Sequence, residues 1–275
     1  MTTHKIFQID AFADQLFSGN PAAIIPLVSF PSDDIMQSIA LENNLSETAF
    51  VVARQDASYD LRWFTPTNEV DFCGHATIAA SHALTAELNK PSPITFHTKI
   101  GVIEVTSGAQ GYTMRTPIFP MQEIPLTNIL KSTFDNLPLA AWHSRKNVFL
   151  MFPDAESIAQ FQPDFSAIKA LSSQKGVDDG VVIMAAGSIQ GDDSAYASYD
   201  FVSRYFVPAF GIDEDPVTGS NHASLGPFWG NRLGKVKLRA YQASARGGVL
   251  DISVEKDHVF MTGQAVTYLR GEIYL

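Results

Sequence analysis

Two stretches of the chain repeat one another, and this repeat restricts the possible folds more than any other feature. GVIEVTSGAQGYTM, residues 101–114, aligns without a gap with GVLDISVEKDHVFM, residues 248–261. Upstream, RWFTPTNEVD (62–71) aligns with RYFVPAFGID (204–213), so the order of the blocks is preserved. The pattern predicts an internal duplication. Each copy would contain strand pairs, an Arg-aromatic-Phe-x-Pro segment, a polar turn, a glycine-led helix and a hairpin.

The length agrees with two halves, because 275 residues can form two domains that each bury their own core. The gap-free alignment pairs Arg62 with Arg204 and Asp71 with Asp213. Prolines cluster between residues 117 and 140, which is typical of a boundary. We therefore expect a first half over residues 1–120 and a second half over 121–275, with the last C-terminal strand free to return to the first half.

Strand-like runs that alternate apolar and polar residues dominate both halves, and helices are fewer. One helix is predicted in PSDDIMQSIALENN, with Ser32 as its N-cap. Residues 76–88, ATIAASHALTAEL, are apolar on nearly every side, which indicates a helix enclosed by other structure. The predicted fold class is α/β (α+β), in which each half is a curled, mostly antiparallel sheet around one central helix.

Charge and composition exclude several classes of protein. A net charge of -10 and a pI near 5.1 argue against a nucleic-acid partner, which clustered Lys and Arg would have to bind. The sequence contains neither an apolar run long enough to span a membrane nor a signal-peptide pattern at its start, so a cytoplasmic protein is expected. A single cysteine, Cys73, excludes an internal disulfide and a multi-cysteine zinc site.

The two glycine-led segments, residues 73–88 and 218–233, each begin a helix. A buried helix still has unpaired N–H groups at its start, and glycine lets a ligand approach them closely. Such ends attract anions. Two duplicated halves that face each other would therefore bind a small carboxylate in the cleft between them. The alternative is that both glycines only permit tight turns and both helices only fill the core.

Three side chains near these helices are candidate proton carriers. His75 lies in the first helical turn, where the helix dipole is expected to lower its pKa and favour neutral imidazole. Glu47 stands where a helix ends and an apolar strand begins, so it is either an acid/base group or an ordinary loop-edge glutamate. Asp215 precedes the second helix.

His82 lies about 10 Å along the helix from His75, too far for a shared metal ion, and no metal site is expected.

Several motifs in order closely resemble the PhzF-like family, named for the phenazine-biosynthesis isomerase. The likeness runs from residue 5 to the C-terminus, and its motifs are DAFADQLFSGNPAAII (10–25), NLSETAFV (44–51), RWFTPTNEVDFCGHAT (62–77), EDPVTGSNHA (214–223) and QASARGG (242–248). The resemblance implies the diaminopimelate-epimerase-like fold, with the active site between two pseudo-symmetric halves. It also implies a homodimer.

The founding isomerase moves a proton within trans-2,3-dihydro-3-hydroxyanthranilate without a cofactor. The resemblance therefore implies a cofactor-independent isomerase of a small carboxylated metabolite, in which Glu47 takes and returns the proton and His75 and Asp215 assist. It also implies a set of substrate-binding residues: Asn20, Ser46, Cys73, Gly74, Ala76, Gly219 and Ser220.

One departure from the related epimerases bears on the mechanism. Those enzymes use two cysteines, and here Cys73 matches the first whereas Thr218 occupies the place of the second. A hydroxyl is far less acidic than a thiol, so single-base isomerisation by Glu47 is preferred. His222, in the pattern Gly-Ser-x-His, resembles the broader family rather than the phenazine enzyme. Two alternatives stay open: a racemase or epimerase that uses Cys73 with Glu47 or His75, and a small-molecule binding protein without turnover.

Overall fold

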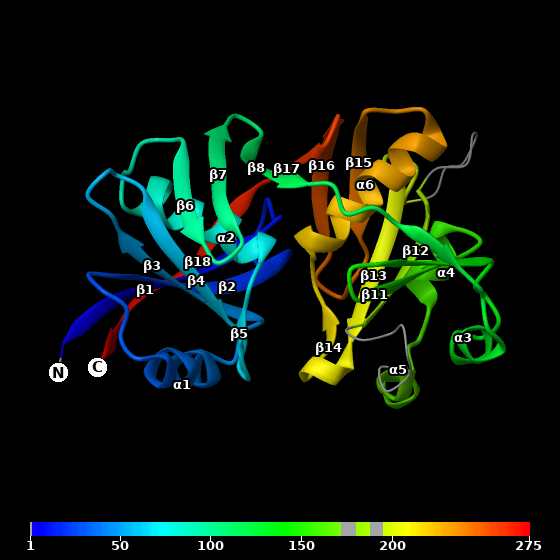
Figure 1. Ribbon diagram of the computed structural model, residues 1–275, viewed down its shortest axis with the longest axis horizontal. Coiled ribbons are helices and arrows are strands. Elements are labelled where there is room, and N and C mark those ends of the chain that lie inside the picture. Colours follow the sequence, from blue (N-terminus) through cyan, green and yellow to red (C-terminus); the bar gives the residue numbers. More distant parts are fainter. Residues whose placement is uncertain (1, 172–179, 188–194) are drawn as a thin grey trace. The chain divides into compact units, whose positions relative to one another are not determined.

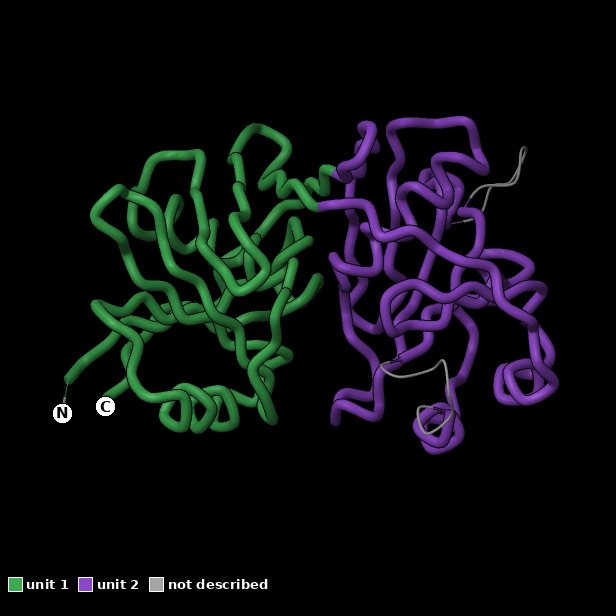
Figure 2. The backbone as a smooth tube through the Cα atoms, viewed as in Figure 1, with its two compact units in different colours: residues 1–116, 260–275 green, residues 117–259 purple. Residues whose placement is uncertain are grey.

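The computed structural model describes residues 2–171, 180–187 and 195–275. The chain forms two compact units (Figures 1 and 2). Unit 1 comprises residues 1–116 and 260–275, and unit 2 comprises residues 117–259. The last strand, β18 (Ala265–Tyr274), belongs to unit 1.

Unit 1 consists mainly of strands around a single buried helix. Its elements are β1 (Thr3–Ala11), β2 (Asn20–Leu27), α1 (Asp33–Asn43), β3 (Glu47–Ala53), β4 (Tyr59–Phe64), β5 (Glu69–Val70), α2 (Gly74–His82), the π-helical η1 (Ala83–Glu87), β6 (Ile94–Thr98), β7 (Gly101–Gly108), β8 (Gly111–Pro117, whose last residue begins unit 2) and β18.

Unit 2 has a similar order of elements with additional short helices. Its elements are β9 (Gln122–Ile124), α3 (Asn128–Thr133), β10 (Ala140–Ser144), β11 (Asn147–Met151), α4 (Ala155–Gln160), α5 (Phe165–Leu171), β12 (Gly180–Ala186), β13 (Phe201–Val207), the 3-10 helix η2 (Pro208–Phe210), β14 (Ile212–Asp215), α6 (Gly219–Leu233), β15 (Lys237–Gln242) and β16 (Gly248–Glu255). The strand β17 (His258–Gly263) begins in unit 2 and continues into unit 1 from Phe260.

The strands of the two units pair in the same order. In unit 1, β1 is antiparallel to β2, and β2 is parallel to β3. The next strand, β4, is antiparallel to β3 and to β5 but parallel to β6. Finally, β6 is antiparallel to β7. In unit 2, β10 to β16 pair in this same pattern in the places of β1 to β7. The outer neighbour of β1 is β18 and that of β10 is β9, both antiparallel. The predicted fold class of two similar halves is confirmed.

The strand register corrects one detail of the sequence repeat. Glu69 lies opposite Phe64, and Glu214 lies opposite Phe206, so these two glutamates occupy equivalent positions. The gap-free pairing of Asp71 with Asp213 was therefore wrong. The reason is local: η2 and an irregularity between Phe206 and Val207 lengthen the connection in the second copy.

The predicted enclosed helix begins two residues earlier than expected. α2 continues directly into η1, and every residue from Gly74 to Ser81 is buried. This helix packs against β1, β2, β3 and β18. α1 begins after Ser32, whose backbone is extended as an N-cap requires, although its hydroxyl forms no capping hydrogen bond. In unit 2, α6 packs against β15 and β16.

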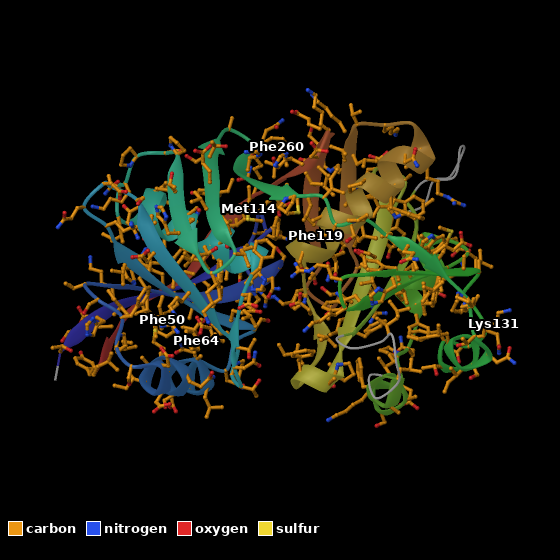
Figure 3. The ribbon with its side chains drawn as sticks, viewed as in Figure 1. Phe50, Phe64, Met114, Phe119, Lys131 and Phe260 are labelled. Carbon is orange, nitrogen blue, oxygen red and sulfur yellow. The ribbon has the colours of Figure 1, made fainter. Side chains whose placement is uncertain are left out.

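Aromatic side chains fill the core of each unit. In unit 1, the rings of Phe50 and Phe64 meet edge to face with centroids 5.5 Å apart (Figure 3). In unit 2, Phe161 stacks on Phe134 at 5.4 Å and also contacts Phe206. Such contacts stabilise a core beyond the burial of apolar area. Within the described residues, no helix is both long enough and apolar enough to cross a bilayer.

Candidate functional site

Four of the predicted site residues meet at the start of α2 in unit 1. The imidazole Nε2 of His75 lies 3.0 Å from Oε2 of Glu47. The other ring nitrogen, Nδ1, lies 3.0 Å from the amide Nδ2 of Asn20 and 3.5 Å from Sγ of Cys73. Local structure explains the grouping, because Asn20 and Glu47 begin the adjacent parallel strands β2 and β3, against which α2 packs.

The charges in this cluster change the proton affinity of His75. Burial alone lowers the pKa of an imidazole, but the charges of Cys73 and Glu47 act in the opposite direction and raise the pKa of His75 well above its usual value. The expectation that the helix dipole would lower it was wrong. A carboxylate 3.0 Å from the ring outweighs the partial charge of a helix end.

Cys73 has the opposite character. Burial, followed by the charge of Glu47, raises the pKa of its thiol to about 11. The thiol is therefore protonated at neutral pH, and a protonated thiol is neither a nucleophile nor a base.

The start of α2 has no side-chain cap of the usual kind. Cys73 is the N-cap residue, with φ of -140° and ψ of 110°, and its side chain makes no capping hydrogen bond. Gly74 and Ala76 lie in the first turn and are buried, and Ser46, directly before β3, is half-buried. The side chain of Glu47 is 15% exposed, although the oxygen that faces His75, Oε2, is buried.

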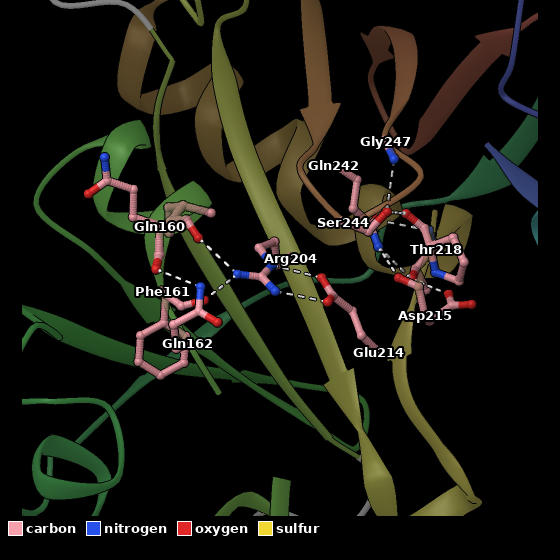
Figure 4. A network of polar contacts seen from close by, with 12 residues as sticks. Gln160, Phe161, Gln162, Arg204, Glu214, Asp215, Thr218, Gln242, Ser244 and Gly247 are labelled. Carbon is pink, nitrogen blue, oxygen red and sulfur yellow. Dashed lines mark hydrogen bonds and ion pairs between the residues drawn. The ribbon is translucent and has the colours of Figure 1, made fainter. Parts of the chain in front are cut away.

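The remaining predicted residues lie in unit 2, at the start of α6. Asp215 ends β14 and accepts a short hydrogen bond from the hydroxyl of Thr218, which is the N-cap residue of α6 (Figure 4). Gly219 and Ser220 follow in the first helical turn, and Gly219 is buried. As in α2, the N-cap side chain does not bond the helix backbone.

Gln242, at the end of β15, holds the turn between Asp215 and α6 in place. Its Oε1 accepts the N–H of Thr218 at 2.9 Å, and its Nε2 donates to the backbone oxygen of Asp215 at 2.7 Å. Ser244 donates to the backbone oxygen of Pro216 at 2.9 Å. These partners were missed as functional residues. Both stand in the QASARGG motif (242–248), but no sequence pattern indicates that the motif folds back onto this turn.

The two copies have diverged where Glu47 stands. Glu47 is the first residue of β3 and lies opposite Ala22 of β2. The equivalent residue of unit 2 is Gly180, the first residue of β12, which lies opposite Asn147 of β11. A Cβ atom at Gly180 would lie 2.5 Å from the backbone oxygen of Phe206 and 2.8 Å from the ring of Tyr205. Unit 2 therefore has no room for a carboxylate here, and its acidic candidate is Asp215 instead.

The fold defines the broad class of protein. The chain superposes on a crystal structure of a probable proline racemase from Agrobacterium radiobacter with a TM-score of 0.65 at 10% identity, covering 99% of this chain and 93% of that one. At this identity the likeness concerns the fold alone. It places the chain among the proline racemase and diaminopimelate-epimerase-like folds, as the sequence predicted.

The family follows from closer matches. The family model described as phenazine biosynthesis-like protein matches residues 9–271, and the chain belongs to this family. An uncharacterized isomerase of Halalkalibacterium halodurans is 40% identical over 278 residues, covering 100% of both chains. A crystal structure of a PhzF-family protein from Enterococcus faecalis matches with a TM-score of 0.91 and 40% identity, again over 100% of both chains. The predicted family is confirmed, and several of the chain's relatives carry the name isomerase.

Proposed function

We propose that the protein is a cofactor-independent isomerase that moves a proton within a small carboxylated metabolite, with Glu47 as the acid/base group. The observation that carries the proposal is the contact of Glu47 with His75. One carboxylate oxygen lies against the imidazole, and the side chain keeps partial access to solvent. A reaction like that of the founding isomerase, on trans-2,3-dihydro-3-hydroxyanthranilate or a related acid, fits this arrangement.

In this mechanism Glu47 removes a proton from a carbon of the substrate and returns it at another position. His75, with its raised pKa, acts as a proton-holding partner that orients the carboxylate and supports its negative charge. Positioned acid/base groups of this kind typically contribute about 10² to 10⁴-fold in rate. Asp215 is proposed as an assisting catalytic group, held by Thr218 and the turn that Gln242 fixes.

Substrate binding is assigned to the two helix starts. The N–H groups around Gly74 and Ala76, and those around Gly219 and Ser220, are donors of the type that binds a carboxylate. Asn20, Ser46 and Cys73 are proposed to line the same site. The protein is also proposed to form a homodimer, which sedimentation velocity would test.

The protonated thiol of Cys73 favours a mechanism with one base, Glu47, over a mechanism with two bases. A second candidate function, racemisation with Cys73 as one of the bases, requires a thiolate, whereas the raised thiol pKa of about 11 keeps the proton on sulfur. In addition, Thr218 supplies only a hydroxyl in the second copy, and that hydroxyl is engaged with Asp215.

The test begins with a thermal-shift screen of carboxylated metabolites, followed by exchange in D₂O monitored by NMR. Glu47→Gln should bind the same acids as the wild type but lose solvent deuterium incorporation by at least about 10²-fold. Cys73→Ala should retain it. Exchange that persists in Glu47→Gln would refute the assignment, and exchange lost in Cys73→Ala would favour the racemase. A ligand that stabilises the wild type without exchange or conversion would indicate a binding protein.

A further inference from the structure

We propose that Glu47, Cys73 and His75 bind a thiophilic divalent cation, Zn²⁺ in the first instance, as an inhibitor of the site rather than as its cofactor. The three side chains each offer one ligand atom, and these atoms all lie within 4.8 Å of one another. They come from β3 and from the first turn of α2, which are packed elements rather than a loose surface loop.

The spacing of the donors fits tetrahedral coordination. Sγ of Cys73 lies 3.9 Å from Nε2 of His75, and this same nitrogen lies 3.0 Å from Oε2 of Glu47. With bonds of about 2.3 Å to sulfur and about 2.0 Å to nitrogen and oxygen, a tetrahedral zinc ion separates its ligands by about 3.3 to 3.6 Å. The two separations at Nε2 therefore differ from this range by only a few tenths of an ångström, and Cys73 and Glu47 must bring their donor atoms, which lie within 4.8 Å, to a similar separation.

The donor set selects the kind of cation. Thiolate and imidazole prefer zinc and similar ions, whereas magnesium and calcium require oxygen ligands. Thiolate and carboxylate together balance two positive charges, so the complex is neutral, which suits a cluster where Cys73 is 5% and His75 3% exposed. On coordination the thiol proton, and any proton on Nε2, pass to solvent.

The surroundings provide two further features of a zinc site. The amide of Asn20 lies beside Nδ1, the ring nitrogen that would not bind the cation. It presents its nitrogen Nδ2 to the ring, so the amide must turn its oxygen towards Nδ1 to accept the N–H of a zinc-binding histidine. Three protein ligands also leave a fourth position for water. Because the cation would occupy Oε2 of Glu47 and Nε2 of His75, its inhibitory effect rests on the proposed function, whereas its binding does not.

The test is a titration of untagged protein with Co²⁺, a spectroscopic substitute for Zn²⁺. We expect one bound ion with a sulfur-to-cobalt charge-transfer band in the near ultraviolet, intense visible bands of four-coordinate cobalt, and loss of both when one equivalent of Zn²⁺ is added. Cys73 is the only cysteine, so the band reports on it alone. Cys73→Ser should abolish the band, and His75→Asn should weaken binding at least tenfold.

The matched control is His82→Asn on the same helix, where Nε2 contacts Thr267 instead, and it should leave the spectrum unchanged. A wild-type protein without the band, or a band that survives in Cys73→Ser, would overturn the proposal. If Cys73→Ser does not fold, the alkylation rate of Cys73 in the wild type decides: protection by Zn²⁺ supports the site, and equal rates overturn it. Loss of exchange in Glu47→Gln without a cobalt spectrum would reject only the cation site.

Discussion

Two histidines on buried helices have opposite proton affinities because their neighbours differ. Burial lowers the pKa of His75, but the charges of Cys73 and Glu47 outweigh it and raise that pKa. His222 on α6 is fully buried, stacks on Phe201 and donates from Nδ1 to the backbone oxygen of Thr218 at 2.8 Å. Burial lowers the pKa of His222 to about 4, and the single backbone contact does not offset it. His222 is therefore neutral at pH 7.

This difference predicts how acid destabilises the protein. Above pH 6.5 His222 is neutral in both the folded and unfolded states, so its contribution to stability is fully present. As the pH falls towards 4, the unfolded state binds a proton that the folded state does not, and the free energy of unfolding decreases by about 3 kcal/mol from this residue. In His222→Asn that loss should disappear, which urea denaturation at several pH values would measure.

Comparing His222→Asn with the wild type separates the contribution of His222 from that of the carboxylates, which are present in both proteins. A stability difference between wild type and His222→Asn that stays constant from pH 7 to pH 4 would contradict the prediction.

At the scale of elements, both copies use one ion pair to connect equivalent strands. Arg62 on β4 donates from Nε and Nη2 to Glu69 on β5 at 2.7 and 2.9 Å. Arg204 on β13 donates in the same way to Glu214 on β14 at 2.8 and 2.9 Å (Figure 4). Bidentate pairs fix geometry as well as charge, so each pair holds the strand that leads to a glycine-led helix.

The two pairs should differ in energy. Arg204 is 8% exposed. Apart from Glu214, its partners among the described residues are the backbone oxygens of Ile158 and Phe161 and the ring of Phe206, so Glu214→Ala would leave a buried charge without a carboxylate. We expect a loss of about 3 to 5 kcal/mol in the free energy of unfolding.

Glu69→Ala is the matched variant and should cost about 1 kcal/mol, because Arg62 is more exposed and keeps Asp33 at 2.9 Å. Urea denaturation of both variants would measure the difference. Equal losses would contradict the view that burial decides the energy of these pairs.

At the scale of the whole molecule, the chain closes unit 1 with its own C-terminus. β18 pairs with β1 from Thr3 opposite Tyr274 to Ala11 opposite Ala265, and the backbones of Thr2 and Leu275 exchange hydrogen bonds. β18 also contacts the central helix region, since Thr267 and Arg270 both donate to Glu87. In unit 2 the corresponding strand, β9, comes near the start of that unit, before β10, the strand with which it pairs.

Removing residues 265–275 should therefore disrupt unit 1 far more than unit 2. β1 would lose its outer partner, and the strands that carry Asn20 and Glu47 would lose their support. Hydrogen exchange with mass spectrometry should show lost protection in β1 to β3 and retained protection in β11 to β13. Equal loss in the two units would mean that they fold only as one cooperative body.

The sequence by itself determined the duplication, the enclosed helix, the fold class and the family, because these depend on periodicity and on motifs that are local in the chain. It also singled out Glu47, Cys73 and His75 as chemically capable residues. Only the tertiary structure decided which of them touch. Asn20 meets His75 across 55 residues, and Gln242 meets Thr218 across 24. It also set the direction of the His75 pKa and the equivalence of Glu69 with Glu214. Such contacts and equivalences depend on strand register and packing, because a change of register by one residue turns every side chain of a strand to the other face of the sheet.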